Sequence, residues 1–173
     1  SKNFYNDRKM YVMNIDGSDL ECVTSSLDQT PSSAFWASNS SGVYFNVREY
    51  GQSNVYYADL RGKLKKITEG NHMLSMNDLV GNNTVATWTD PSNPSDIVTF
   101  SIDKSKNIKR LTNVNEDIFY NVEFGKVEEI NYKSLDGKTV QGWIVKPPNF
   151  NSDKKYPLVL RIHGGPHSMY HVG

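Results

Sequence analysis

The chain has 173 residues, of which 37% are hydrophobic and 12% aromatic, and this composition favours a folded chain over a disordered one. Nineteen basic and nineteen acidic residues cancel, so the charge gives no reason to expect nucleic acid or an anionic membrane as a partner. The single cysteine, Cys22, cannot form a disulfide within the chain. No segment is apolar and long enough to span a membrane, and the first residues do not read as a signal peptide. The compartment stays open between cytoplasm and periplasm.

A repeat runs through the first two thirds of the chain. A threonine and two apolar positions recur at intervals of 44 residues: Thr24, Thr68 and Thr112; Val23, Ile67 and Leu111; Leu20, Leu64 and Ile108. A period near 44 is typical of the four-stranded blade of a β-propeller. A series of hairpins in a β-sandwich is the alternative, and the shared register favours the propeller.

Each repeat consists of a β-rich run, a polar turn and a second run that ends in an apolar residue and the threonine. The first runs cover residues 11–16, 55–60 and 97–103, and the second runs cover 20–24, 63–68 and 107–112. Further strands at 43–47 and 84–88 precede two of these hairpins. We therefore predict the outer half of one blade over 11–24, a full blade over 31–68 and a second over 73–112. Two to three blades cannot close a ring, so we expect part of a larger propeller or a core completed by another copy.

The pattern changes after Thr112. One more strand is predicted at 119–124, followed by a hairpin of residues 127–134 and 139–146 around the turn at Asp136-Gly137. The apolar run 158–162 then predicts a short buried strand. This strand ends at His163-Gly164-Gly165-Pro166, a bend in which backbone amides can be aimed outward. Enzymes of the α/β-hydrolase class build half of an oxyanion hole from a buried strand that ends in such a loop.

The order of these features resembles the prolyl oligopeptidase family of serine peptidases. The resemblance is carried by the repeats followed by Ser134-Leu-Asp-Gly, Gly142-Trp143, Pro147, Lys155-Tyr-Pro and His163-Gly-Gly-Pro-His. It covers nearly all of the chain, is most specific over 127–170, and is closest to the acylaminoacyl-peptidase and bacterial dipeptidyl-peptidase branches. It implies a mainly β chain, with the last two to three blades of a β-propeller over 1–120. The first strands of an α/β-hydrolase domain, truncated before the nucleophile, would cover 121–173.

The resemblance also implies a set of site residues. Gly165 would donate its backbone N–H to the tetrahedral oxyanion, and Gly164 would shape the turn. His163 stands where other branches place a tyrosine whose hydroxyl helps the oxyanion; it could donate there, but we favour a structural histidine. The sequence contains no Gly-x-Ser-x-Gly, so the Ser–Asp–His triad is not expected in this chain. None of its histidines is assigned as the triad base: His72, His163, His167 and His171.

The whole enzyme that the resemblance implies would cleave short peptides near their N-terminus through an acyl-enzyme, without a metal or organic cofactor. This chain alone would be inactive because the triad is missing. Its expected partners are a short peptide substrate and the remainder of the peptidase chain, with a homo-oligomer left open. The alternative is a non-enzymatic propeller that serves as a protein-binding scaffold. The repeats fit both interpretations, whereas residues 156–168 fit only the peptidase.

Two other patterns have simpler interpretations. His163, His167 and His171 are spaced by four, as for metal ligands on a helix, but Gly-Gly-Pro interrupts any helix and structural zinc needs four ligands. Glu128-Glu129 resembles the acidic pair that holds a substrate amine in dipeptidyl peptidases. Adjacent strand residues point to opposite faces, so a solvated strand is the better prediction for this pair.

Overall fold

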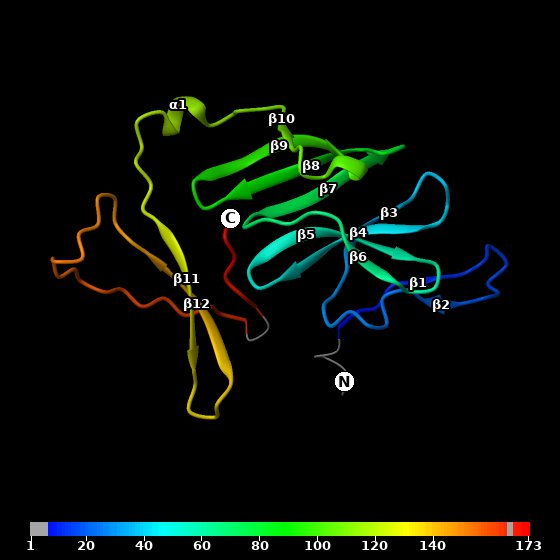
Figure 1. The fold of residues 1–173 in the computed structure, drawn as a ribbon, viewed down its shortest axis with the longest axis horizontal. Helices are drawn as coiled ribbons and strands as arrows, with labels where there is room; N and C mark the ends of the chain where they lie inside the picture. Colours follow the sequence, from blue (N-terminus) through cyan, green and yellow to red (C-terminus); the bar gives the residue numbers. More distant parts are fainter. Residues whose placement is uncertain (1–6, 166–167) are drawn as a thin grey trace. The chain divides into compact units, whose positions relative to one another are not determined.

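The computed structural model describes residues 7–165 and 168–173, and its regular structure is nearly all strand (Figure 1). It divides into two compact units, residues 1–114 with 171–173, and residues 115–170. The first unit holds ten strands and a 3-10 helix over Ile102–Lys104: β1 (Tyr11–Val12), β2 (Glu21–Cys22), β3 (Ser32–Trp36), β4 (Gly42–Glu49), β5 (Gln52–Asp59), β6 (Leu64–Lys66), β7 (Met73–Val80), β8 (Asn83–Asp90), β9 (Asn93–Ser101) and β10 (Lys109–Arg110).

These strands form two four-stranded antiparallel blades. Strands β3 to β6 pair in chain order, and β7 to β10 do the same. The blades meet in one short parallel pairing of Ser53 on β5 with Met73 on β7. Strands β1 and β2 form a separate hairpin. The mainly β fold and the partial propeller are therefore confirmed, with the strands inside the predicted blade limits.

The repeated threonine closes the outer hairpin of each blade. Each threonine hydroxyl accepts a hydrogen bond of 2.8–2.9 Å from a backbone amide across the hairpin: Thr24 from Met10, Thr68 from Val55, and Thr112 from Ile97. Two of the hydroxyls also donate to a side chain next to that amide, Thr68 to Asn54 at 3.1 Å and Thr112 to Asp96 at 2.7 Å. The 44-residue period thus arises because the same threonine hydrogen bond recurs at the same place in each hairpin.

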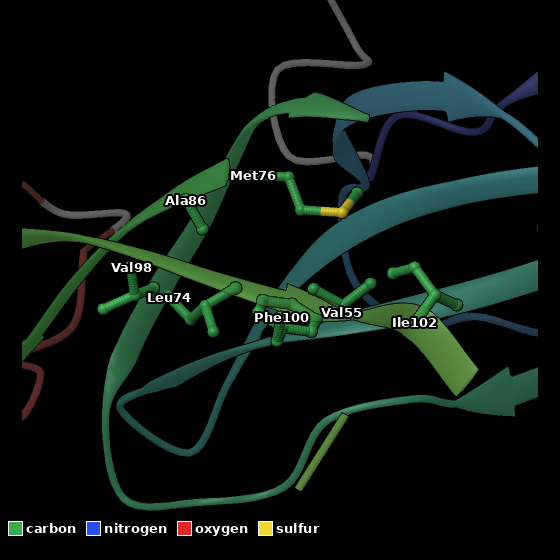
Figure 2. Packing of buried hydrophobic residues seen from close by; sticks show 7 residues of the cluster. All are labelled: Val55, Leu74, Met76, Ala86, Val98, Phe100 and Ile102. Atoms are coloured by element: carbon green, nitrogen blue, oxygen red, sulfur yellow. The ribbon is translucent and has the colours of Figure 1, made fainter. Parts of the chain in front are cut away.

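The core lies between the faces of neighbouring blades. Figure 2 shows one cluster, built from β5 of one blade, from β7, β8 and β9 of the next, and from the 3-10 helix: Val55, Leu74, Met76, Ala86, Val98, Phe100 and Ile102. A second cluster joins the first hairpin to the first full blade: Val23, Leu27, Phe45, Val47 and Ala58. Each blade is therefore stabilised mainly by its neighbours, as in other repeat architectures.

One buried amide links the two blades. Asn46 on β4 is 2% exposed, and its Nδ2 donates to the carbonyl of Leu74 at 2.7 Å while its Oδ1 accepts from the amide of Met76 at 2.8 Å. Ser53 Oγ also donates to the Leu74 carbonyl, at 2.6 Å. The Asn46 side chain thus supplies hydrogen bonds to the edge of β7 where no backbone strand pairs with it.

The second unit contains a single helical turn, α1 (Glu116–Phe119), and a hairpin of β11 (Val127–Lys133) and β12 (Thr139–Val145). The hairpin agrees with the prediction, and its turn places Gly137 at φ +80°. The strand predicted at 119–124 is absent. A helical turn ends at Phe119 and residues 120–124 have no regular structure; Glu116 and Asp117 lie in the first turn of the helix, where negative charge is favourable. No helix in the described part of the chain could cross a membrane.

The structure does not form the buried strand predicted at 158–162. No strand is present between residues 146 and 165, and four apolar side chains there are 78–90% exposed: Leu158, Val159, Leu160 and Ile162. The reason is the lack of a partner, since β11 and β12 pair only with each other. A central strand of an α/β sheet needs neighbours on both edges, and local sequence cannot supply them.

Candidate functional site

The bend after residue 162 is open and needs glycine. Gly165 lies at φ +147°, a backbone conformation that L side chains rarely adopt. A Cβ added at Gly164 would meet no heavy atom within 4 Å. Within the part of the chain that the structure describes, no hydrogen bond involves the Gly165 amide. A backbone amide that has no hydrogen bond to any described residue can donate to an anionic oxygen.

Tyr170 contacts the segment that leads into this bend. The Arg161 guanidinium lies 5.3 Å from the centre of its ring, and the His163 ring meets it edge-on at 6.0 Å between centroids. Nδ1 of His163 is also 2.9 Å from the carbonyl oxygen of Gly164, a distance at which a protonated Nδ1 donates. These contacts orient His163 beside the two glycines.

The remaining histidines lie in different settings. His72, just before β7, is 7% exposed, and burial lowers the pKa of its imidazole. His171 is exposed, and its Nδ1 accepts a hydrogen bond of 3.3 Å from the Gly173 amide. His167 and Pro166 lie outside the described residues. Among the described residues, no three His, Cys, Asp or Glu side chains are grouped so that they could hold a metal ion.

The two adjacent glutamates of β11 have different partners. Glu128 binds the ammonium of Lys126 at 2.9 Å and that of Lys146 at 2.6 Å. Glu129 accepts a hydrogen bond of 3.0 Å from the side-chain amide of Asn131. The hydrogen bond from Lys146, followed by that from Lys126, lowers the pKa of the Glu128 carboxyl to about 2. Glu128 is therefore already paired with two cations of its own chain.

We expect the Glu128 carboxyl to titrate near pH 2, and the Lys146→Met variant to titrate closer to the ordinary value of 4.5. Because the pKa is lower in the folded state, the contribution of this group to stability is present above pH 4.5 and is lost as the pH falls toward 2. Carboxyl carbon shifts measured by NMR across this range test the expectation. An unchanged midpoint in Lys146→Met would contradict it, and Lys133→Met, which replaces a lysine of β11 bound to Thr139, is the control.

Comparison with curated proteins finds similarity to peptidases. It is 29% identical over 181 residues to the uncharacterized peptidase YuxL of Bacillus subtilis, and the match covers 94% of this chain and 27% of that protein. It is 26% identical over 160 residues to dipeptidyl-peptidase 5 of Porphyromonas gingivalis, covering 92% of the chain and 23% of the relative. A probable dipeptidyl-peptidase 5 of Aspergillus terreus is 30% identical over 176 residues, which is 96% of the chain and 24% of that protein.

A solved structure, the acylaminoacyl peptidase of Pyrococcus horikoshii, matches with a TM-score of 0.76 at 22% identity, over 96% of this chain and 25% of that one. This match shows the fold. The similarity to curated peptidases supports the resemblance to the prolyl oligopeptidase family found in the sequence. No family model matches the chain. The chain spans about a quarter of the length of the curated relatives cited above.

The curated relatives are named as peptidases, in agreement with the resemblance found in the sequence. The sequence did not reveal two features near the bend. One is the contact of Tyr170 with Arg161 and His163, and the other is the return of residues 171–173 to the first unit. Arg161, His163 and Tyr170 can be read from the sequence, but their contact cannot be predicted from it. Residues that meet across a loop show no regular spacing that would indicate the contact.

Proposed function

We propose that residues 1–120 are the last blades of a propeller and that residues 121–173 begin the catalytic α/β-hydrolase domain of a serine peptidase. The division of the structure near residue 114 supports this proposal, as do two complete blades in the first unit. The rest of the hydrolase domain would cover the exposed apolar side chains between Leu158 and Ile162. Four largely exposed aliphatic side chains within five residues are costly in water, at about 1.5–3 kcal/mol each relative to burial.

The observation that carries the proposed chemistry is the bend with Gly165 at φ +147°. In our proposal the Gly165 amide donates to the oxygen of the substrate carbonyl as it becomes negative during attack. The absence of a side chain at Gly164 and Gly165 lets the substrate carbonyl approach the backbone. One such donor is worth about 3–4 kcal/mol of transition-state stabilisation. His163 orients the bend through its contacts with Gly164 and Tyr170.

The attacking serine and its Asp–His partners would come from the part of the enzyme that this chain does not contain. The reaction is transfer of the peptide acyl group to serine with release of the amine, followed by hydrolysis of the ester by water. The names of the relatives, dipeptidyl-peptidase and acylaminoacyl peptidase, support short peptides processed near the N-terminus as substrates. No step requires a metal or an organic cofactor.

The test compares the full-length protein with the 173-residue chain, using a fluorophosphonate label and a set of dipeptidyl and acyl-aminoacyl chromogenic substrates. We expect the full-length protein to be labelled covalently and to release product, and the 173-residue chain to do neither. A folded full-length protein that is neither labelled nor active would favour the scaffold interpretation. Organophosphate-sensitive turnover by the short chain would also contradict the proposal.

A further inference from the structure

The two blades of the first unit are hydrogen-bonded to each other along one short stretch, residues 72–76 at the start of β7. The Ser53 amide on β5 donates to the His72 carbonyl at 2.9 Å, and the Ser53 hydroxyl donates to the Leu74 carbonyl at 2.6 Å. The Asn46 side chain bonds to the rest of the stretch. His72 is therefore the first residue of the segment that holds the second blade against the first.

The imidazole of His72 is enclosed at this contact. The residue is 7% exposed, and its Nε2 has no hydrogen-bond partner among the described residues. A Cβ on Gly70 would lie 2.5 Å from both Nδ1 and Cε1 of the ring, so the backbone at Gly70 is packed against it. The Trp88 ring on β8 is 6.3 Å away between centroids, tilted by 53°. The indole N–H is only a donor, so Trp88 offers no acceptor to an imidazole N–H.

A protonated imidazole is much less favourable than a neutral one in this setting. Both ring nitrogens would then be donors, and a full positive charge would be held away from water with no acceptor for Nε2. Two charged groups act on the ring: Asp90 at the end of β8 favours its protonation, and Lys66 on β6, bound to Glu49 at 2.7 Å, opposes it. Burial has the largest effect and lowers the pKa of His72.

We propose that His72 makes the contact between the two blades sensitive to acid: when its imidazole takes up a proton, residues 72–76 loosen from β5 while the strands within each blade stay paired. The carbonyl that accepts from Ser53 belongs to the same residue, so moving the charged ring into water displaces that carbonyl and breaks its hydrogen bond. The inference does not depend on the proposed peptidase chemistry.

The experiment measures urea unfolding of the 173-residue chain between about pH 7.5 and about pH 5.5, where histidines titrate and ordinary carboxyls do not. Because the pKa of His72 is lower in the folded state than the ordinary 6.5, the unfolded chain binds more protons below pH 6.5, and stability is lost as the pH falls through that value. We expect the folding equilibrium constant to fall by up to about tenfold per pH unit there, the limit for one proton.

His72→Phe keeps an aromatic ring that does not titrate, so its folding constant should stay within about twofold over the same range. His171→Gln is the matched control, because it removes an exposed histidine of the same unit, and it should follow wild type. A wild-type constant that does not change with pH would overturn the proposal, as would the same pH dependence in His72→Phe as in wild type.

Two measurements on the wild-type chain need no variant. The NMR titration of the His72 ring should have its midpoint below pH 6.5, and a midpoint at or above 6.5 would overturn the proposal even if His72→Phe did not fold. Hydrogen exchange locates the loosening. At about pH 5.5 the Ser53 amide should lose protection, while amides of β4 and β8, which pair only within their own blades, keep theirs. Equal loss at all three would show global unfolding and would also overturn the proposal.

Discussion

Replacing Asn46 by leucine should lower the free energy of unfolding of the 173-residue chain by about 2–4 kcal/mol. The side chain is 2% exposed and holds the Met76 amide and the Leu74 carbonyl of the next blade, at 2.8 and 2.7 Å. Leucine has a similar size but no hydrogen-bonding group. The Met76 amide would remain buried without a partner, whereas the Leu74 carbonyl would keep its bond from Ser53. The expected loss of stability therefore comes from the Met76 amide, which would have no partner, and from the Leu74 carbonyl, which would lose one of its two hydrogen bonds.

Urea denaturation followed by circular dichroism measures this loss. Asn77→Leu is the control, because Asn77 is an exposed asparagine on β7 whose side chain accepts one hydrogen bond, from Thr87. That variant should change the unfolding free energy by less than about 0.5 kcal/mol. If the two variants cost the same, the amide of Asn46 does not link the blades energetically. A reduced slope against urea for Asn46→Leu would further indicate that the blades no longer unfold as one unit.

The blades were predictable from the sequence because their signal is local and repeated. The hydroxyls of Thr24, Thr68 and Thr112 each bond to an amide across their own hairpin, so the same residue type recurs at the same step. The hairpin of β11 and β12 was predictable for a related reason, since Asp136-Gly137 fixes the turn and the strands follow from it.

Other features depend on contacts that local sequence does not encode. The run 158–162 has the composition of a buried strand, yet it is exposed here because no strand pairs with it. Residues 171–173 pack on the first unit through a hydrogen bond of the Val172 backbone amide and through close packing at Gly173, where a Cβ would clash. A backbone contact of this kind leaves little trace in the residue types of the sequence. Asn46 was a visible clue, because a polar residue within the apolar run 43–47 needs a buried partner. The helical turn at Glu116–Phe119 also had a signal, two acidic residues at its start, which the aromatic residues that follow obscured.

Substituting Gly165→Ala in the full-length protein should lower kcat about a hundredfold or more, if its amide is the oxyanion donor that we propose. Alanine is strained at the φ of +147° that Gly165 adopts, so the peptide would rotate and the N–H would turn away from the developing charge. Because the interaction strengthens in the transition state, KM should change little while kcat and kcat/KM fall together.

Gly17→Ala is the matched control for this substitution, since Gly17 also has a positive φ, +88°, and a Cβ there would meet no heavy atom within 4 Å. It lies in the turn between β1 and β2, so alanine there introduces backbone strain without touching the bend. Equal loss of kcat in both variants would assign the effect to strain in general. Full activity of Gly165→Ala per labelled active site would show that the negative oxygen is held by other donors and that the Gly165 amide takes no part in the reaction. A selective loss at Gly165 ties the amide to the reaction itself, since strain alone is common to both positions.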